Sequence, residues 1–322
     1  MTKKNNEQND ENQNNNIDQD NLEIIMADVL DLLNIKVSYN ERLAQINNII
    51  NQVDANYPKL NLAILSSTVS YDQINYVITP EGIKNSKRDA KDGIVLFGYD
   101  KNYKMNSNLS RSNSNSEIKK NLEESEEFIL NDFVFPSDGK RDASGLNEFP
   151  NFAIYFNVDD KNYYIKDFKT GVGALMKIKK FTMEGSTLVN IGSNYLVINI
   201  EKNKIIIKIF NNTILENKNM KENKGPNCDI KEFYIKYNEH KLITIGRNEK
   251  CDIVLDDAML SKVHSCIEYD PKNKLFYLYD GDKNRESTNG TWVFILNSFK
   301  ITDNFLFKAE RTLFMATLTN NK

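Results

Sequence analysis

The N-terminal part of the chain carries apolar residues at helical spacing. The first apolar face consists of Leu22, Ile25, Val29 and Leu33. A second helical pattern follows Ser38, which stands three residues before Glu41 in the spacing of a capping box. Its apolar stripe consists of Leu43, Ile46, Ile50 and Val53. Residues 20–58 are therefore predicted to be a short α-helical segment.

Two interpretations of this helical segment stay open. In the first, its apolar faces dock on the chain's own β domain; in the second, residues 21–56 bind a partner or a second copy of the chain. The heptads are too few to predict a coiled coil. Residues 1–19 are mostly Asn, Gln, Asp, Glu and Lys, which bury too little apolar surface to offset the entropy cost of ordering. We expect them to form a disordered tail.

From Leu60 onwards, apolar and polar residues alternate with the period of β-strands. Short runs of this kind, separated by turn-forming residues, continue to about Leu318. Many short strands at regular spacing indicate an all-β sandwich architecture.

The strand region contains an internal repeat. Residues 93–100 parallel residues 241–248, and later segments of the two halves correspond in the same order. The further pairs are 131–135 with 251–255, 151–155 with 264–268, 163–167 with 275–280, and 170–174 with 287–291. The strand patterns at 186–192 and 195–199 are expected to close the first copy, and those at 305–307 and 313–314 the second. The sequence thus predicts domains over residues 59–202 and 203–320, with a Ser/Asn-rich insertion at 101–127.

Charge and composition exclude several classes of protein. The net charge is −3 over 322 residues, and the lysines are interspersed with acidic residues, which does not suit a nucleic-acid binder. No apolar stretch approaches the roughly 20 residues of a membrane helix, and the N-terminus lacks the apolar core of a signal peptide. The three scattered cysteines form no disulfide framework. We expect an intracellular protein, nuclear or cytoplasmic, that contacts neither nucleic acid nor membrane.

Catalytic chemistry has no support in the sequence. The chain contains two histidines, His240 and His264, and neither belongs to an acid–base–nucleophile pattern. The sequence has no Walker loop, no G-x-S-x-G elbow and no metal-ligand spacing. We therefore expect no enzymatic activity, no metal and no cofactor.

Polar residues at predicted strand ends are concentrated between residues 243 and 292. They form three elements: Gly246-Arg247, Ser261-x-x-His264 and the turn Ser287-Thr288-Asn289-Gly290-Thr291. A charged donor, hydroxyls and an Asn-Gly turn at strand ends suit recognition of an oxyanion by loops. The segment closely resembles a forkhead-associated (FHA) domain, a β-sandwich that binds phosphothreonine peptides. The resemblance implies two tandem FHA-type β-sandwich domains, the second of which is well matched.

The resemblance also implies roles for residues of the second copy. Arg247, Ser261 and Thr288 would donate hydrogen bonds to the phosphate oxygens, and Asn289 would hold the peptide backbone. Lys262 would add positive potential. The framework of the loops would consist of Gly246, His264 and Gly290.

Simpler interpretations of these residues stay open. Arg247 could form a surface salt bridge with Glu249 or Asp252, and the Ser261 hydroxyl could cap a turn. Lys262 and Arg285 either contact the peptide or are ordinary exposed cations.

The first copy lacks the phosphate-binding set. Tyr99 stands at the position of Arg247, and Glu148 falls near that of Ser261; Asn151 and Val172 replace the histidine and the asparagine. A carboxylate near a phosphate is repulsive, and the loss of arginine removes a bidentate donor. We expect residues 59–202 to fold without binding phosphate.

Two functions follow as hypotheses. The first is an adaptor or signalling scaffold that binds a phosphothreonine-containing protein through residues 203–320, which are expected to fold on their own. By resemblance, phosphothreonine is preferred over phosphoserine. The alternative is a structural component of a larger assembly, in which both sandwiches bind proteins independently of phosphate.

Overall fold

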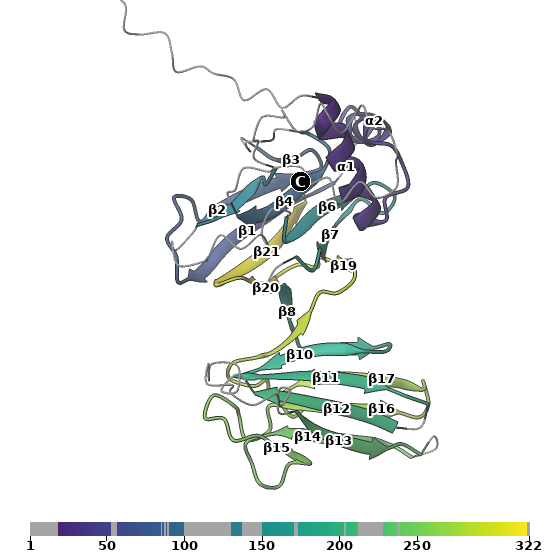
Figure 1. Ribbon diagram of the computed structural model, residues 1–322, viewed down its shortest axis with the longest axis vertical. Coiled ribbons are helices and arrows are strands. Elements are labelled where there is room, and N and C mark those ends of the chain that lie inside the picture. The colour runs from purple at the N-terminus through teal and green to yellow at the C-terminus, as the bar shows by residue number, and fades with distance from the viewer. Residues whose placement is uncertain are drawn as a thin grey trace, which may run out of the picture.

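Strands dominate the computed structural model of the chain (Figure 1), so the predicted all-β class is confirmed. The structure describes residues 19–52, 57–99 apart from 85, 87 and 89, 130–136, 150–170, 173–202, 204–211, 228–236 and 239–320. The predicted insertion and nearly all of the predicted tail lie outside these residues.

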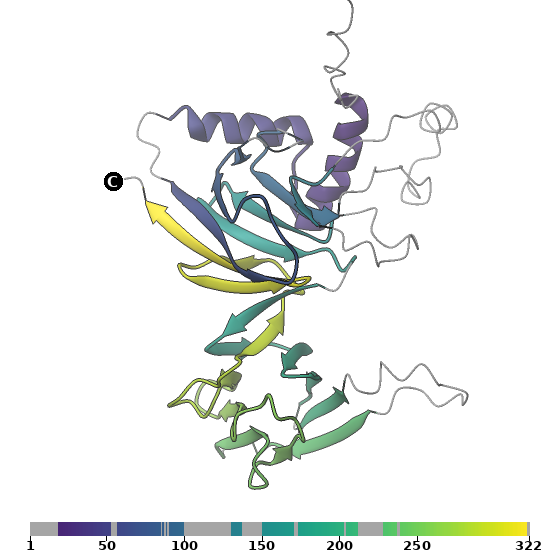
Figure 2. The ribbon, with the colours of Figure 1, turned by 90° about the vertical axis from the view of Figure 1, so that its left-hand side faces the viewer.

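The described N-terminal part contains two helices, α1 (Gln19–Leu33) and α2 (Tyr39–Ile50). The predicted capping box begins α2: the Glu41 N–H donates to Ser38 Oγ at 3.3 Å, and the Ser38 N–H donates to Glu41 Oε2 at 2.9 Å. α1 lies over the outer face of a sheet (Figure 2), where it packs against Leu96 and Tyr155. Ile46 and Ile49 of α2 belong to the main core. The inner face of α1 is therefore covered by the chain's own β domain. Partner binding through the helices stays a prediction.

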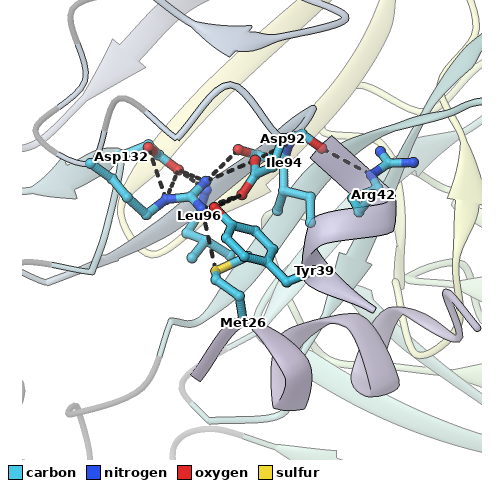
Figure 3. Close-up of polar contacts among 8 residues, drawn as sticks. Met26, Tyr39, Arg42, Asp92, Ile94, Leu96 and Asp132 are labelled. Carbon is cyan, nitrogen blue, oxygen red and sulfur yellow. Dashed lines mark hydrogen bonds and ion pairs between the residues drawn. The ribbon is translucent and has the colours of Figure 1, made fainter. Parts of the chain in front are cut away.

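A buried polar cluster fastens the helices to the sheet (Figure 3). The Arg88 guanidinium contacts two carboxylates, Asp92 Oδ2 at 2.5 Å and Asp132 Oδ2 at 2.8 Å. From α2, Tyr39 donates its hydroxyl to Asp92 Oδ2 at 3.3 Å, and Arg42 donates Nε to the Asp92 carbonyl at 2.9 Å. Two arginines and two aspartates balance in charge, which satisfies the requirement that buried ions be paired.

The first sandwich, together with the helices, forms the upper part of Figure 1. Its shorter sheet has the order β19-β7-β6-β4-β5. These strands are β4 (Ile94–Tyr99), β5 (Phe133–Phe135), β6 (Phe152–Asn157), β7 (Asn162–Asp167) and β19 (Phe299–Lys300). The facing strands are β1 (Pro58–Ser67), β2 (Asn75–Thr79), β3 (Gly82–Ile83), β8 (Ala174–Ile178), β20 (Phe305–Ala309) and β21 (Thr312–Asn320).

The second sandwich forms the lower part of Figure 1. Its shorter sheet, β9-β17-β16-β14-β15, repeats the order of the first, and both β4–β5 and β14–β15 are parallel pairs. These strands are β9 (Lys180–Met183), β14 (Lys241–Gly246), β15 (Ile253–Val254), β16 (Ser265–Asp270) and β17 (Leu275–Asp280). The facing strands are β10 (Thr187–Ile191), β11 (Asn194–Ile200), β12 (Lys204–Asn211), β13 (Asp229–Tyr234) and β18 (Thr291–Phe294).

One long sheet passes through both sandwiches, in the order β13-β12-β11-β10-β18-β8-β20-β21-β1-β2-β3. Its centre is the antiparallel pair of β18 and β8, in which Trp292 lies opposite Lys177. Lys308 of β20 adds a polar contact at this junction, because its ammonium donates to Asn190 Oδ1 at 2.7 Å. The two sandwiches are therefore joined by continuous hydrogen bonding between strands.

The strand pairing corrects the predicted closure of each copy. The strands expected to close the first copy, β10 and β11, pair with β18 and β12 of the second sandwich. The strands expected to close the second, β20 and β21, pair with β8 and β1 of the first. The sheets thus do not follow a boundary between residues 202 and 203. The strands of the second sandwich run from β9 to β18, and they lie within the chain of the first.

Candidate functional site

Arg247 lies immediately after β14, at one end of the second sandwich. A Cβ added to Gly246 would stand 2.3 Å from the Lys262 carbonyl oxygen, so glycine alone fits this close approach. The Arg247 N–H donates to the Ser261 carbonyl at 3.3 Å, which joins the two loops. The Arg247 side chain is exposed, and no described residue pairs with its guanidinium.

The competing salt bridge of Arg247 is not formed in the described part of the chain. Asp252 instead accepts hydrogen bonds from the Thr244 N–H and hydroxyl, both at 2.8 Å. Arg247 is therefore a cation held at its backbone with its charged end directed to solvent.

Ser261 and Thr288 bring two hydroxyls together beside Arg247. Their Oγ atoms are 3.4 Å apart, and the Thr288 N–H donates to Ser261 Oγ at 3.1 Å. The Ser261 hydroxyl is thus engaged with the turn, as the capping interpretation expects. It retains its own proton for donation, because as an acceptor from Thr288 it uses a lone pair.

His264 is fully buried beneath these loops. Its Nδ1 accepts from the Ser261 N–H at 3.2 Å, and its Nε2 lies 3.1 Å from the Gly290 carbonyl. A ring that accepts at Nδ1 and donates at Nε2 is neutral. Burial lowers the pKa of His264, which favours the same neutral form. His264 therefore joins the Ser261 loop to the Gly290 turn from inside.

A buried network that the sequence analysis did not find completes the framework. Asp280 accepts from the Ser287 hydroxyl at 2.6 Å, from the Ser287 N–H at 3.1 Å and from the Thr291 hydroxyl at 2.8 Å. Ser287 in turn accepts from the Gly290 N–H at 2.9 Å, and Thr291 lies 2.6 Å from the Ser265 hydroxyl. An aspartate at a strand end, followed by Ser and Thr in a turn, was the available signal. Its carboxylate fixes both ends of the turn that carries Asn289.

Asn289 is directed across to the β15–β16 connection. Its Nδ2 donates to the Met259 carbonyl at 2.7 Å, and its own carbonyl accepts from Trp292 Nε1 at 3.1 Å. Gly290 follows with φ of +79°, a conformation that favours glycine. The structure thus places Asn289 as a link between loops, and its expected contact with a peptide stays a prediction.

Lys262 and Arg285 are exposed cations at the same loops. The Lys262 carbonyl accepts from the Asn248 N–H at 3.1 Å, while no described residue contacts its ammonium. The Arg285 N–H donates to Asp282 Oδ1 at 2.8 Å, and the Arg285 carbonyl accepts from the Asp282 N–H at 3.2 Å, which shapes a tight loop before Ser287. The structure therefore gathers Arg247, Ser261 and Thr288 into one cluster and leaves these two cations beside it.

The equivalent end of the first sandwich has the same backbone and different side chains. The Asn151 N–H donates to the Phe97 carbonyl at 2.7 Å, as the His264 N–H donates to that of Ile245 at 2.8 Å. The Asn151 side chain, however, donates to Glu310 Oε1 at 2.9 Å. Tyr99 ends β4 as Gly246-Arg247 ends β14. The predicted replacements Glu148 and Val172 lie outside the described residues.

The described residues contain no group of three or more His, Cys, Asp or Glu side chains placed to hold a metal ion. None of the helices in the described ranges is long and apolar enough to cross a membrane. Cys228, Cys251 and Cys266 carry free thiols, and burial raises the pKa of the Cys266 thiol to about 11.

Residues 243–308 match the family model of the FHA domain. The match covers β14 to β20 and contains all eight residues predicted for the site and its framework. No curated protein and no solved structure matches the chain. FHA domains are non-catalytic modules that bind phosphopeptides in protein–protein interactions, and this is the class that the sandwich and its loops define. The C-terminal part of this chain carries such a domain.

Proposed function

We propose that this protein binds phosphothreonine-containing segments of another protein and acts as an adaptor or signalling scaffold. The observation that carries the proposal is Arg247, whose guanidinium is exposed and without a partner among the described residues, and whose backbone N–H is bonded to the loop of Ser261, the hydroxyl of which pairs with that of Thr288. An exposed cation without a described partner, on loops that buried hydrogen bonds hold in place, is suited to an anionic ligand.

The chemistry of a phosphothreonine side chain fits this cluster. It carries a charge of about −1.5 to −2 and three acceptor oxygens. Arg247 supplies charge-assisted donors, and Ser261 and Thr288 supply hydroxyl donors to the remaining oxygens. Lys262 adds positive potential. Asn289 gives up its hydrogen bond to the Met259 carbonyl and bonds the peptide backbone instead. Because the buried groups below are already satisfied, binding requires little rearrangement.

The first sandwich is proposed to be a degenerate FHA copy that does not read phosphate. Its shorter sheet has the same strand order as that of the second sandwich. The Asn151 N–H donates to the Phe97 carbonyl of β4, as the His264 N–H donates to the Ile245 carbonyl of β14. Tyr99 offers a single neutral hydroxyl where Arg247 offers a permanent charge. Its role is to support the second sandwich through the long sheet.

We further propose that the protein is non-enzymatic and belongs to a reducing, intracellular compartment, nucleus or cytoplasm; the three free thiols suit such a compartment. The compartment is not needed for the binding mechanism.

A paired peptide library tests the proposal. The full chain is immobilised and exposed to degenerate peptides with a central phosphothreonine, threonine or phosphoserine. We expect capture of phosphothreonine peptides only, since the family resemblance implies a small slot for the threonine methyl group. Equal capture of phosphorylated and unphosphorylated peptides would support the alternative, a structural component that uses both sandwiches as phosphate-independent modules.

A further inference from the structure

The loop that carries Thr288 and Asn289 is held from the side of β8. At its start, the Asp280 N–H donates to the Lys179 carbonyl at 3.1 Å. In its middle, Glu286 lies between two lysines, with Oε1 3.0 Å from Lys179 Nζ and Oε2 3.8 Å from Lys177 Nζ. At its end, Lys177 packs on the turn, because its Cε stands 2.6 Å from where a Cβ on Gly290 would lie. Residues 177–179 therefore contact the whole length of the loop.

This segment belongs to the junction between the two sandwiches. Upstream, the Ala174 N–H donates to Asp167 of the first sandwich at 2.7 Å, and β8 pairs with β20. Downstream, Lys177 lies opposite Trp292 of β18, and Lys180 begins β9. A strand anchored in the first sandwich thus reaches the candidate phosphate site of the second.

Glu286 creates an electrostatic problem that these lysines solve. It precedes Thr288 by two residues, so the two Cα atoms are separated by at most about 7.6 Å. This separation is within the Debye length of about 8 Å at physiological salt, so an uncompensated carboxylate would oppose a bound phosphate. The lysines hold and neutralise it: the hydrogen bond from Lys179, and then the charges of Lys179 and Lys177, lower the pKa of Glu286.

We propose that Lys177 and Lys179 are positioning residues of the phosphopeptide site, which neutralise Glu286 and direct it away from the phosphate. The inference rests on the proposed function and gives the segment that leaves the first sandwich a direct part in it. Lys177 lies in β8, which pairs with β20 of the first sandwich, and Lys179 follows between β8 and β9. The site of the second sandwich is incomplete without this segment.

The test removes the two charges and keeps the side-chain stems. In the full chain, Lys177→Met/Lys179→Met is expected to weaken binding of a phosphothreonine peptide three- to tenfold. Adding Glu286→Gln should restore the affinity to within about twofold of wild type, because the unneutralised carboxylate is then gone. Lys180→Met is the matched control: its ammonium lies 3.8 Å from the centre of the Tyr277 ring, and its removal should leave affinity unchanged.

Salt dependence separates this role from a structural one. The difference between the double variant and wild type should shrink as salt rises from about 0.1 M to about 1 M, where the Debye length is about 3 Å. Lys179→Met alone carries the same test if the double variant is unstable, since 85% of that side chain is exposed. A loss that Glu286→Gln does not restore, or the absence of any loss, overturns the inference. If Arg247→Ala in the same series leaves binding unchanged, the proposed function itself fails, and this inference fails with it.

Discussion

Exposed and buried polar residues of the site differ in what their loss should change. The Arg247 guanidinium is exposed to solvent, so replacing Arg247 should weaken ligand binding and leave the fold intact. His264 and Asp280 lie under the loops and hold them, so their removal affects the fold first. Affinity and melting temperature, measured together, separate these two groups.

Arg247→Ala is expected to be the most damaging single change to phosphopeptide binding. Hydrogen bonds to charged groups contribute about 1.5–3 kcal/mol, against about 1 kcal/mol for neutral ones. We therefore expect a tenfold to hundredfold loss of affinity or more, ahead of Ser261→Ala and Asn289→Ala, with the melting temperature unchanged. Calorimetric titration and thermal unfolding of each variant check this. Unfolding without loss of affinity in the surviving folded protein would place Arg247 in the framework instead.

His264 should make stability depend on pH. Its pKa is lowered in the folded state by burial, so the unfolded chain binds a proton first as pH falls. The stabilising contribution of neutral His264 is present above about pH 6.5 and is lost as pH falls from there towards the folded pKa. His264→Asn introduces the residue that the first copy has at position 151. This variant should be less stable at pH 7, and its melting temperature should change less between pH 7 and pH 5 than that of the wild type. Parallel pH dependences of variant and wild type would refute this.

The sequence shows the loop motifs of the candidate site and does not show the buried network beneath them. The loop motifs are local, because each consists of residues that are neighbours in the sequence. They are Gly246-Arg247, Ser261-x-x-His264 and the Asn-Gly turn. The network of Asp280 with Ser287 and Thr291 escaped notice because a single aspartate at a strand end is indistinguishable from a solvated one. Its surroundings include Lys179, which is distant in sequence and whose carbonyl accepts from the Asp280 N–H.

At the level of elements, the helices are fastened by charge as well as by apolar packing. Arg42 of α2 is buried, with Nη2 2.5 Å from the Phe156 carbonyl. Helical periodicity predicted α1, α2 and the capping box because these are local features. The oxygen partners of Arg42 and Arg88 lie outside the helices, so the periodicity of the helices does not predict these contacts.

Arg88→Met should destabilise the protein strongly. It would leave Asp92 and Asp132 buried without their counterion, and breaking a buried ion pair from one side costs about 3–5 kcal/mol. Urea unfolding measures this free energy. Lys36→Ala is the control, because its pair with Asp31 is exposed and should contribute at most about 1 kcal/mol. Similar small effects of both changes would show that the cluster does not hold the helices.

At the scale of the whole molecule, the repeat explains why the closing strands were assigned to the wrong sandwich. The β10–β11 and β20–β21 hairpins have the same alternating pattern, so either could complete either copy. The pattern fixes which face of a strand is buried and not which partner it takes. Long-range pairing of β18 with β8 and of β1 with β21 decides the closure.

Fragments test this arrangement. Residues 203–320 lack β8 to β11, so β18 loses both of its neighbours and β12 loses β11, the strand beside the buried Ile205, Ile207 and Ile209. We expect this fragment not to unfold cooperatively, whereas residues 173–298, which contain every strand of the second sandwich, should. Circular dichroism melting of both fragments checks the prediction. Cooperative melting of 203–320 would instead support closure by the strands that follow it.

The central claim is that the Arg247 site recognises phosphate on threonine. Its most direct test is a calorimetric titration of the full chain with one library-selected peptide in its phosphothreonine and unphosphorylated forms. Loss of the charged hydrogen bonds, at about 1.5–3 kcal/mol each, predicts binding of the phosphorylated form at least tenfold tighter. Equal affinity for the two forms, or binding of neither, would contradict the account.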